Sequence, residues 1–250
     1  MDIKLLIMDL DDTLISETSG ITQKIINTVN KVREKGIKVS IATGRMHSSA
    51  FPFAEKLSIT EPIISYNGAL VKYLDAEEPI VHWPVSYENA MQVLKFARKS
   101  KKFVQYYSQD EYYVPNHNAL SDLYGRMTGR RAVETNCDLA DSLDFDPTKL
   151  LIIADNGKEG ESIYNAAKER FEGILNITRS SDTYVEFNNI KASKGAACET
   201  LAQKYGYMLD NIMSIGNGGN DVDMLKKCGI GVAVGNAVQK AKDAADYICP

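Results

Sequence analysis

The sequence has few of the residues that would point to a disulfide scaffold or to a metal site built from histidine and cysteine. It contains four scattered cysteines, none in a C-x-x-C pair: Cys137, Cys198, Cys228 and Cys249. In a chain of this length, that pattern is typical of free thiols in a cytoplasmic protein. The three histidines are equally scattered, so we interpret them as surface or packing residues and not as a metal cluster or a catalytic base.

Long apolar runs and an excess of positive charge are also missing. No segment approaches the apolar length of a membrane span, and the apolar part of the N-terminal MDIKLLIMDL is too short for a signal peptide. The net charge of −4 provides no broad basic field for nucleic acid. We therefore expect neither a membrane nor a nucleic acid as partner. The 250 residues, 44% hydrophobic and 25% charged, are enough for one large domain or two modest ones.

The first part of the chain alternates between two patterns. IKLLIM, KVSIATG and PIISYNGAL are short apolar runs, as expected of strands buried on both faces. Between them, TQKIINTVNKVREKG has helical periodicity, and RMHSSAFPFAEKL reads as a helix interrupted near Pro52. This order predicts a parallel sheet with right-handed crossovers.

The rhythm changes after a hairpin predicted around residues 75–79. A helix capped by Ser86, two strands joined at Gln109 and Asp110, and a later series of strand, helix, strand and strand indicate an antiparallel α+β unit. The alternation of helices and buried strands then returns. The predicted fold is α/β, with a Rossmann-like parallel-sheet core (residues 1–81 and 185–250) interrupted by an inserted α+β domain (residues 82–184).

Polar residues follow the predicted core strands where each strand ends. In an open parallel sheet, ligands bind beyond the carboxyl ends of the strands, so these side chains should share one crevice. They are Asp9, Leu10 and Asp11 after the first strand, Thr43, Gly44 and Arg45 after the second, Lys194 at a helix start, and Asn217, Asn220 and Asp221 after a late strand. Such a set suits a phosphate and a divalent cation.

The chemistry of these groups suggests a division of roles. The Asp9 carboxylate can attack phosphorus, and Asp11 can protonate the leaving oxygen and then deprotonate water. Mg²⁺, which prefers oxygen ligands, would offset the repulsion between the carboxylates and the phosphate. Lys194, the Thr43 hydroxyl and the Gly44 amide can bind phosphoryl oxygens.

The motifs DLDDTL, ATGR, SKG and GNGGND occur in the order of the four motifs of the haloacid dehalogenase superfamily of phosphotransferases, and the chain resembles that family. ISYNGAL and NDVDML are similar to stretches of its Cof-type sugar-phosphatase branch, and the insertion resembles the class IIB cap. The resemblance implies a nucleophile at Asp9 and an acid/base at Asp11. It implies Mg²⁺ at Asp9, Asp11, Asn217 and Asp221, and phosphate or substrate at Leu10, Thr43, Gly44, Arg45, Lys194 and Asn220.

Two features depart from the family pattern. Position 217 is Asn where the family has a metal-binding Asp, and relatives are expected to continue past ADYICP with a loop and a helix. The leading interpretation is a cytoplasmic Mg²⁺-dependent phosphomonoester hydrolase, monomeric or weakly dimeric, for small phosphorylated metabolites such as sugar phosphates. The alternatives are a non-catalytic or impaired phosphate-ligand-binding protein, because of Asn217, and a phosphomutase. Tyr106, Tyr107, Gln109 and Tyr112 either recognise the substrate or pack on their sheet.

Overall fold

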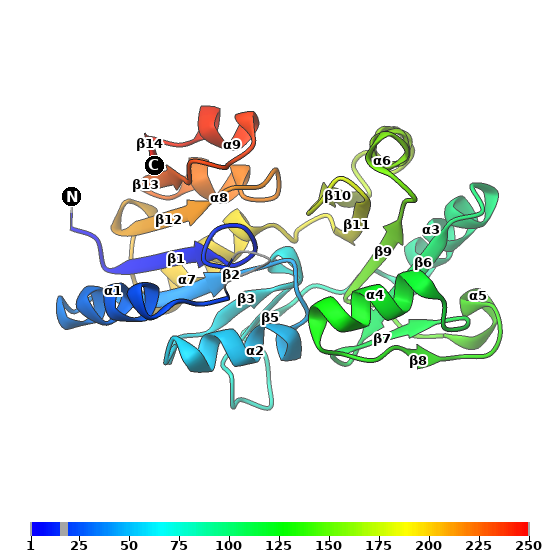
Figure 1. Ribbon diagram of the computed structural model, residues 1–250, viewed down its shortest axis with the longest axis horizontal. Coiled ribbons are helices and arrows are strands. Elements are labelled where there is room, and N and C mark those ends of the chain that lie inside the picture. The colour runs from blue at the N-terminus through cyan, green and yellow to red at the C-terminus, as the bar shows by residue number, and fades with distance from the viewer. Residues whose placement is uncertain (1, 16–19, 250) are drawn as a thin grey trace. The chain divides into compact units, whose positions relative to one another are not determined.

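The computed structural model describes residues 2–15 and 20–249. The chain forms two compact units, Met1–Val81 with Ser193–Pro250, and His82–Ala192 (Figure 1). The inserted unit ends at Ala192, and not at residue 184 as the sequence predicts. Tyr184 begins strand β11 (Tyr184–Asn189), which pairs with two other strands of the inserted unit, so the predicted boundary would have removed a strand from its sheet.

The first unit is built on a sheet whose strands follow the order β14, β13, β12, β1, β2, β3, β4, β5. The pairs from β14 to β3 are parallel, and β3 with β4 is antiparallel. The strands are β1 (Leu5–Asp9), β2 (Lys38–Ala42), β3 (Ile63–Ser65), β4 (Leu70–Lys72), β5 (Val81–His82), β12 (Ile212–Gly216), β13 (Ile230–Ala233) and β14 (Tyr247–Ile248). The predicted parallel core is confirmed.

Helices cover both faces of this sheet. In β1, Leu6 and Met8 pack on one face with α1 (Gln23–Glu34) and α2 (His47–Lys56). Leu5 and Ile7 pack on the other face with α7 (Lys194–Tyr205) and α8 (Val222–Lys227). A strand buried on both faces needs a continuous apolar run, which explains why the apolar residues of IKLLIM do not alternate with polar ones. The last helix, α9 (Gln239–Ala244), packs against α8 and β13.

Local capping residues set the helix ends. The Thr22 side chain caps α1 by accepting from the Ile25 amide, and the Ser193 side chain caps α7 by accepting from the Ala196 amide. The prediction that α2 is interrupted near Pro52 is wrong, because the helix continues through that residue to Lys56.

A short 3-10 segment, η1 (Tyr66–Gly68), joins β3 to β4. A second one, η2 (Leu209–Asn211), precedes β12. Tyr66 and Asn67 both have positive φ, 52° and 55°, which is uncommon for residues with a side chain. This tight reversal turns the chain directly after β3 and places Asn67 at the end of the sheet where the site residues gather.

The second unit contains a six-stranded sheet in the order β10, β11, β9, β6, β7, β8. Its elements are α3 (Tyr87–Lys99), β6 (Phe103–Ser108), β7 (Glu111–Val114), α4 (Ala119–Thr128), β8 (Val133–Glu134), α5 (Leu139–Ser142), β9 (Lys149–Ile153), α6 (Gly157–Arg170), β10 (Leu175–Arg179) and β11. Ser86 caps α3 and Gln109 and Asp110 form the β6–β7 turn, as predicted. The α4 crossover makes β7 and β8 parallel. The prediction of an antiparallel sheet is therefore wrong for this one pair of strands.

Helices α3, α5 and α6 pack on one face of this sheet and form its hydrophobic core. Tyr106 belongs to that core and donates its hydroxyl to the Phe145 carbonyl, so its role is packing. Tyr107 and Tyr112 are buried, with their rings stacked, while Gln109 is exposed at the turn. Within the described part of the chain, every helix is too short or too polar to cross a membrane.

Candidate active site

The centre of the site is a buried lysine between two aspartates. The ammonium group of Lys194, the first residue of α7, lies 2.6 Å from Asp9 Oδ1 and 2.6 Å from Asp221 Oδ1. All three side chains are almost completely buried. Residues from three separate sequence motifs therefore meet at the carboxyl end of β1, as the parallel topology predicts.

Electrostatics at this centre pull in opposite directions. Burial and the nearby charge of Asp221 raise the pKa of Asp9 to about 7, although Lys194 opposes that change. Burial disfavours the charge of Lys194, but the attraction of Asp221 and Asp9 outweighs it, so the pKa of Lys194 lies above its usual value. The lysine is thus a permanent cation, while the charge of Asp9 is sensitive to anything that changes the field around it.

Asp221 is fixed by the loop between β12 and α8. One of its oxygens contacts Lys194, and the other accepts from the backbone amides of Asn217 and Gly218 at 2.9 and 2.8 Å. The Asn217 side-chain oxygen accepts from the Thr13 hydroxyl at 3.1 Å. The loops that follow β1 and β12 are therefore connected through side chains, and Asp221 serves as their charged anchor.

The turn after β2 is connected to the same loop. Thr43 is fully buried, and its side-chain oxygen accepts from the Arg45 amide at 3.1 Å. The Asn67 amide donates to the Thr43 carbonyl, and the Asn67 side-chain oxygen accepts from the Asn220 amide group at 2.9 Å. A side chain at Gly44 would lie within 3.0 Å of that same Asn67 oxygen. Close packing of Gly44 against Asn67 thus fixes this edge of the site.

Arg45 and Asp11 form a bidentate ion pair. The Arg45 Nε lies 3.1 and 3.0 Å from the two Asp11 carboxylate oxygens, and its Nη2 lies 2.6 Å from Oδ1. The guanidinium group also stacks on Phe53, 4.9 Å from the ring centre. Fork-to-fork pairs of this kind fix orientation as well as charge. In this structure, Arg45 therefore contacts the predicted acid/base itself.

The donor chemistry here fits a magnesium ion. Among residues 2–15 and 20–249, no three His, Cys, Asp or Glu side chains gather closely enough to hold a metal. Mg²⁺ does not need such a cluster, because it is usually bound by one or two carboxylates and completes its octahedron with water. Asp9 offers a carboxylate, while Asp11 and Asn217 offer neutral carbonyl oxygens. Asp221 is the poorest candidate for direct contact, since both its oxygens already accept from N–H donors.

The remaining predicted residue acts through its backbone. The Leu10 side chain is fully buried in the core, and its carbonyl accepts from the amides of Leu14 and Ile15. Any contact of Leu10 with a ligand must therefore come from the main chain. The turn that Leu10 organises carries Asp11 and Asp12, and the Asp12 carbonyl accepts from the Asn236 side chain.

Sequence reasoning missed several supporting residues. Thr13, which contacts Asn217, is the last residue of the Asp-x-Asp-x-Thr motif, and that motif could have identified it. Asp223 accepts from the Ser193 hydroxyl at 2.5 Å and so fixes the residue before Lys194; its signal is the second Asp of NDVDML. Asn67, which contacts Asn220, lies in the ISYNGAL stretch.

The chain matches one family, described as haloacid dehalogenase-like hydrolase, over residues 6–250. Two proteins of Bacillus subtilis are similar over nearly their whole lengths. The 5-amino-6-(5-phospho-D-ribitylamino)uracil phosphatase YcsE is 26% identical, covering 99% of this chain and 90% of the relative. The phosphatase YwpJ is 26% identical, covering 98% and 94%.

Solved structures show the same fold. A haloacid dehalogenase-like hydrolase from Bacteroides thetaiotaomicron is 27% identical, covers 98% of this chain and 93% of its own, and superposes with a TM-score of 0.84. A subclass IIB sugar phosphatase is 23% identical with a TM-score of 0.82, covering 98% and 92%, a likeness of fold. Since these likenesses extend over nearly the whole chain, the chain belongs to the haloacid dehalogenase-like hydrolase family and is a phosphatase of that family.

Proposed function

We propose that the chain is a Mg²⁺-dependent phosphomonoester hydrolase that acts on small phosphorylated metabolites through an aspartyl-phosphate intermediate. The observation that carries the proposal is the buried contact of Lys194 with both Asp9 and Asp221. A cation held there would bind the phosphoryl oxygens next to the carboxylate that attacks phosphorus.

In the first step, an Asp9 oxygen forms a bond to phosphorus while the bond from phosphorus to the ester oxygen breaks. The departing oxygen takes a proton from Asp11, and the substrate alcohol leaves. In the second step, Asp11 removes a proton from water, and the water oxygen attacks phosphorus. The acyl phosphate bond breaks and regenerates the Asp9 carboxylate. Mg²⁺ held by Asp9, the Asp11 carbonyl and Asn217 would supply charge neutralisation for the dianionic phosphate.

Arg45 gives this scheme a way to release Asp11. The guanidinium group holds Asp11 in the structure, and an incoming phosphate likewise offers it two oxygens for a bidentate contact, with more negative charge. When Arg45 turns to the phosphate, Asp11 is free to accept and donate a proton. The expected phosphate contact of Arg45 and its observed contact with Asp11 are then two states of one side chain.

Small phosphorylated metabolites are the proposed substrate class because related proteins act on them. One relative is named for a phosphorylated ribitylaminouracil, and one structural neighbour is described as a sugar phosphatase. We propose that the second unit serves as a cap that selects among such compounds, as the class IIB resemblance implies, in a cytoplasmic enzyme.

The test is release of inorganic phosphate from a panel of phosphorylated metabolites, with and without Mg²⁺. Wild-type protein should release phosphate continuously, and Asp9→Asn should lose kcat by far more than the roughly 10²–10⁴-fold expected for a lost acid/base. Formation of a phosphate isomer without stoichiometric release would identify a mutase instead. Near-normal turnover by Asp9→Asn would exclude Asp9 as the nucleophile.

A further inference from the structure

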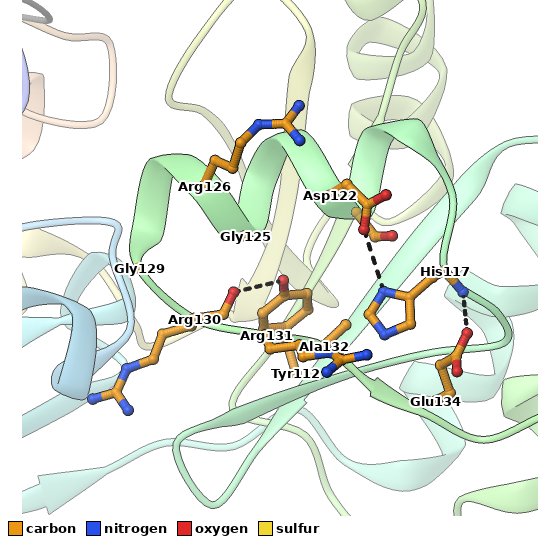
Figure 2. Close-up of a pocket in the computed structure, with 11 residues that line it drawn as sticks. Tyr112, His117, Asp122, Gly125, Arg126, Gly129, Arg130, Arg131, Ala132 and Glu134 are labelled. Atoms are coloured by element: carbon orange, nitrogen blue, oxygen red, sulfur yellow. Dashed lines mark hydrogen bonds and ion pairs between the residues drawn. The ribbon is translucent and has the colours of Figure 1, made fainter.

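The second unit contains a cavity whose lining residues have no role in the steps proposed above. It measures about 730 Å³ and lies between α4 and the segment that leads from α4 into β8 (Figure 2). Pockets for small molecules usually measure about 300–1,000 Å³, so the volume suits a metabolite. Its charged lining residues are His117, Asp122, Arg126, Arg130, Arg131 and Glu134.

The two acidic residues of the cavity both lie next to His117. The Glu134 carboxylate accepts from the His117 backbone amide at 2.6 Å, and Asp122 Oδ1 lies 3.5 Å from His117 Nδ1. The two hydroxyl groups of the lining already donate hydrogen bonds within the protein. Tyr112 donates to the Arg130 carbonyl at 3.2 Å, and Ser121 donates to the Asn118 carbonyl at 2.9 Å.

The three arginines have no such partners. Within the described part of the chain, no Asp or Glu forms an ion pair with Arg126, Arg130 or Arg131, and their guanidinium groups make no hydrogen bond. Arg126 lies in the last turn of α4, where the helix dipole favours a cation. Arg130 and Arg131 follow the end of the helix and have no such explanation.

The positions of the side chains single out Arg131. Figure 2 shows its guanidinium group below α4, on the side where His117 and Glu134 lie, whereas Arg126 extends above the helix and Arg130 extends to the lower left. The backbone there is closely packed, since a side chain at Gly125 would lie 2.8 Å from the Arg130 carbonyl oxygen. The turn that presents Arg130 and Arg131 is therefore held against α4.

We propose that this cavity is a second ligand site, which binds the phosphate group of a small molecule, with Arg131 as the principal contact and Arg130 at the rim. Arginine is suited to this role because its planar fork matches phosphate oxygens bidentately. The available donors exceed the available acceptors, so a ligand rich in acceptors and negatively charged complements the cavity. Free inorganic phosphate and a phosphorylated metabolite share this chemistry.

The test follows the ring nitrogens of His117 by NMR in full-length protein at constant pH in EDTA. The chain has three histidines, and the His117 signal is assigned by its loss in His117→Gln. Two probes distinguish the sources of phosphate: inorganic phosphate, and a sugar phosphonate whose carbon–phosphorus bond is not hydrolysed. The sugar without its phosphonate group is the uncharged control.

We expect at least one phosphate-bearing probe to move the His117 signal with saturation, while the uncharged sugar does not. Arg131→Gln should raise the half-saturating concentration at least about tenfold, because a charge-assisted contact is worth about 1.5–3 kcal/mol. Arg170→Gln is the matched control, since it removes an exposed arginine of α6 in the same unit, and it should change nothing.

An unmoved His117 signal with every probe would overturn the proposal. Equal effects of Arg131→Gln and Arg170→Gln would also overturn it, because they would mean that only the general field changed. If Arg131→Gln fails to fold, Arg130→Gln replaces it, with a smaller rise expected in the same direction. The His117 signal lies in the second unit and does not depend on catalysis. The outcome of this test is therefore independent of whether Asp9 is the nucleophile.

Discussion

Asp9 is a carboxylate that the proposed reaction needs in its ionised form, in a place where the fold disfavours ionisation. Its pKa lies near 7 because burial and Asp221 outweigh Lys194. A bound cation would lower the pKa of Asp9 and favour the carboxylate, which is the role given to Mg²⁺ in the proposed reaction.

This conflict predicts a pH-dependent cost to stability. In the unfolded chain, Asp9 ionises near its usual value of 3.8, but in the folded protein it ionises only near 7. Folding therefore loses stability as pH rises from about 4 to about 7. Asp9→Asn removes this cost. In EDTA, its gain in Tm over wild type should widen from pH 5 to pH 7 and then level off, as measured by thermal unfolding. A gain that does not depend on pH would contradict the assignment.

Arg45 should act on the binding of phosphate more than on the stability of the fold. If its guanidinium group transfers from Asp11 to the substrate, Arg45→Ala should raise KM and the inhibition constant of inorganic phosphate together, by roughly tenfold, given about 1.5–3 kcal/mol for a charged hydrogen bond. Arg33→Ala is the control, because Arg33 donates to the carbonyls of Leu57 and Ser58, outside the site. An unchanged inhibition constant in Arg45→Ala would limit its role to positioning Asp11.

Asn217 should weaken the metal site without abolishing it. Its neutral oxygen already accepts from Thr13, and hard cations prefer carboxylates. Asn217→Asp should therefore lower the Mg²⁺ concentration needed for half-maximal phosphate release. Asn30→Asp, on the exposed surface of α1, adds the same charge elsewhere and should have no effect. If both variants behave alike, position 217 does not face the metal.

At the scale of elements, the site depends on how η1 packs against the start of α7. Gly68 has φ of +94°, and a side chain there would lie 2.2 Å from the Ser193 carbonyl oxygen. Ser193 caps α7, whose first residue is Lys194. Lys194 is therefore placed by a glycine in another segment, and no sequence pattern around Lys194 reveals that dependence.

Gly68→Ala should destabilise the protein by clearly more than backbone strain alone. Gly36 is a matched control, because it also has positive φ, +79°, but has open space where a side chain would lie. Gly36→Ala should cost about 1–2 kcal/mol, whereas Gly68→Ala should cost more and also lower kcat by displacing Lys194. Urea unfolding and phosphate release measure the two effects. Equal costs for the two variants would mean that η1 moves freely away from α7.

Local features of the sequence predicted local structure well. The cap at Ser86 and the turn at Gln109 and Asp110 depend on neighbouring residues only, so both are predicted correctly from the sequence. The continuation of α2 through Pro52, by contrast, depends on packing in the core. The crossover helix α4 is not among the helices that we predict from the sequence.

Long-range contacts in the site were predictable only in part. Parallel topology brings Asp9, Lys194 and Asp221 to one edge of the sheet, and the family resemblance named them. The pairing of Arg45 with Asp11 joins residues 34 positions apart and depends on side-chain geometry that no spacing encodes. The sequence therefore indicates which residues gather at the site, but only the structure shows which of them contact one another.

At the scale of the whole molecule, the inserted unit is built to fold as an independent body. Its sheet and helices α3, α5 and α6 enclose a core of their own. Its two ends are also joined, because the Asn189 side chain donates to the Pro84 carbonyl at 2.7 Å. The Asn176 side chain donates to the Ala192 carbonyl at 2.5 Å. A unit whose two ends are joined in this way can be inserted into the chain of another domain while its own sheet stays intact.

This closure predicts that residues 82–192, expressed alone, form a folded domain with a cooperative thermal transition. The matched control is the shorter fragment 82–184, which follows the boundary expected from the sequence. It lacks nearly all of β11, the strand that pairs with both β9 and β10, and it loses the contact of Asn189 with Pro84. Removal of this interior strand exposes the core, leaves β10 without its partner and leaves one edge of β9 unpaired, so the shorter fragment should show no cooperative transition. Circular dichroism and calorimetry on both fragments decide the matter. If both fragments unfold cooperatively, β11 is dispensable for the fold. If both are unfolded, the inserted unit needs the first unit in order to fold.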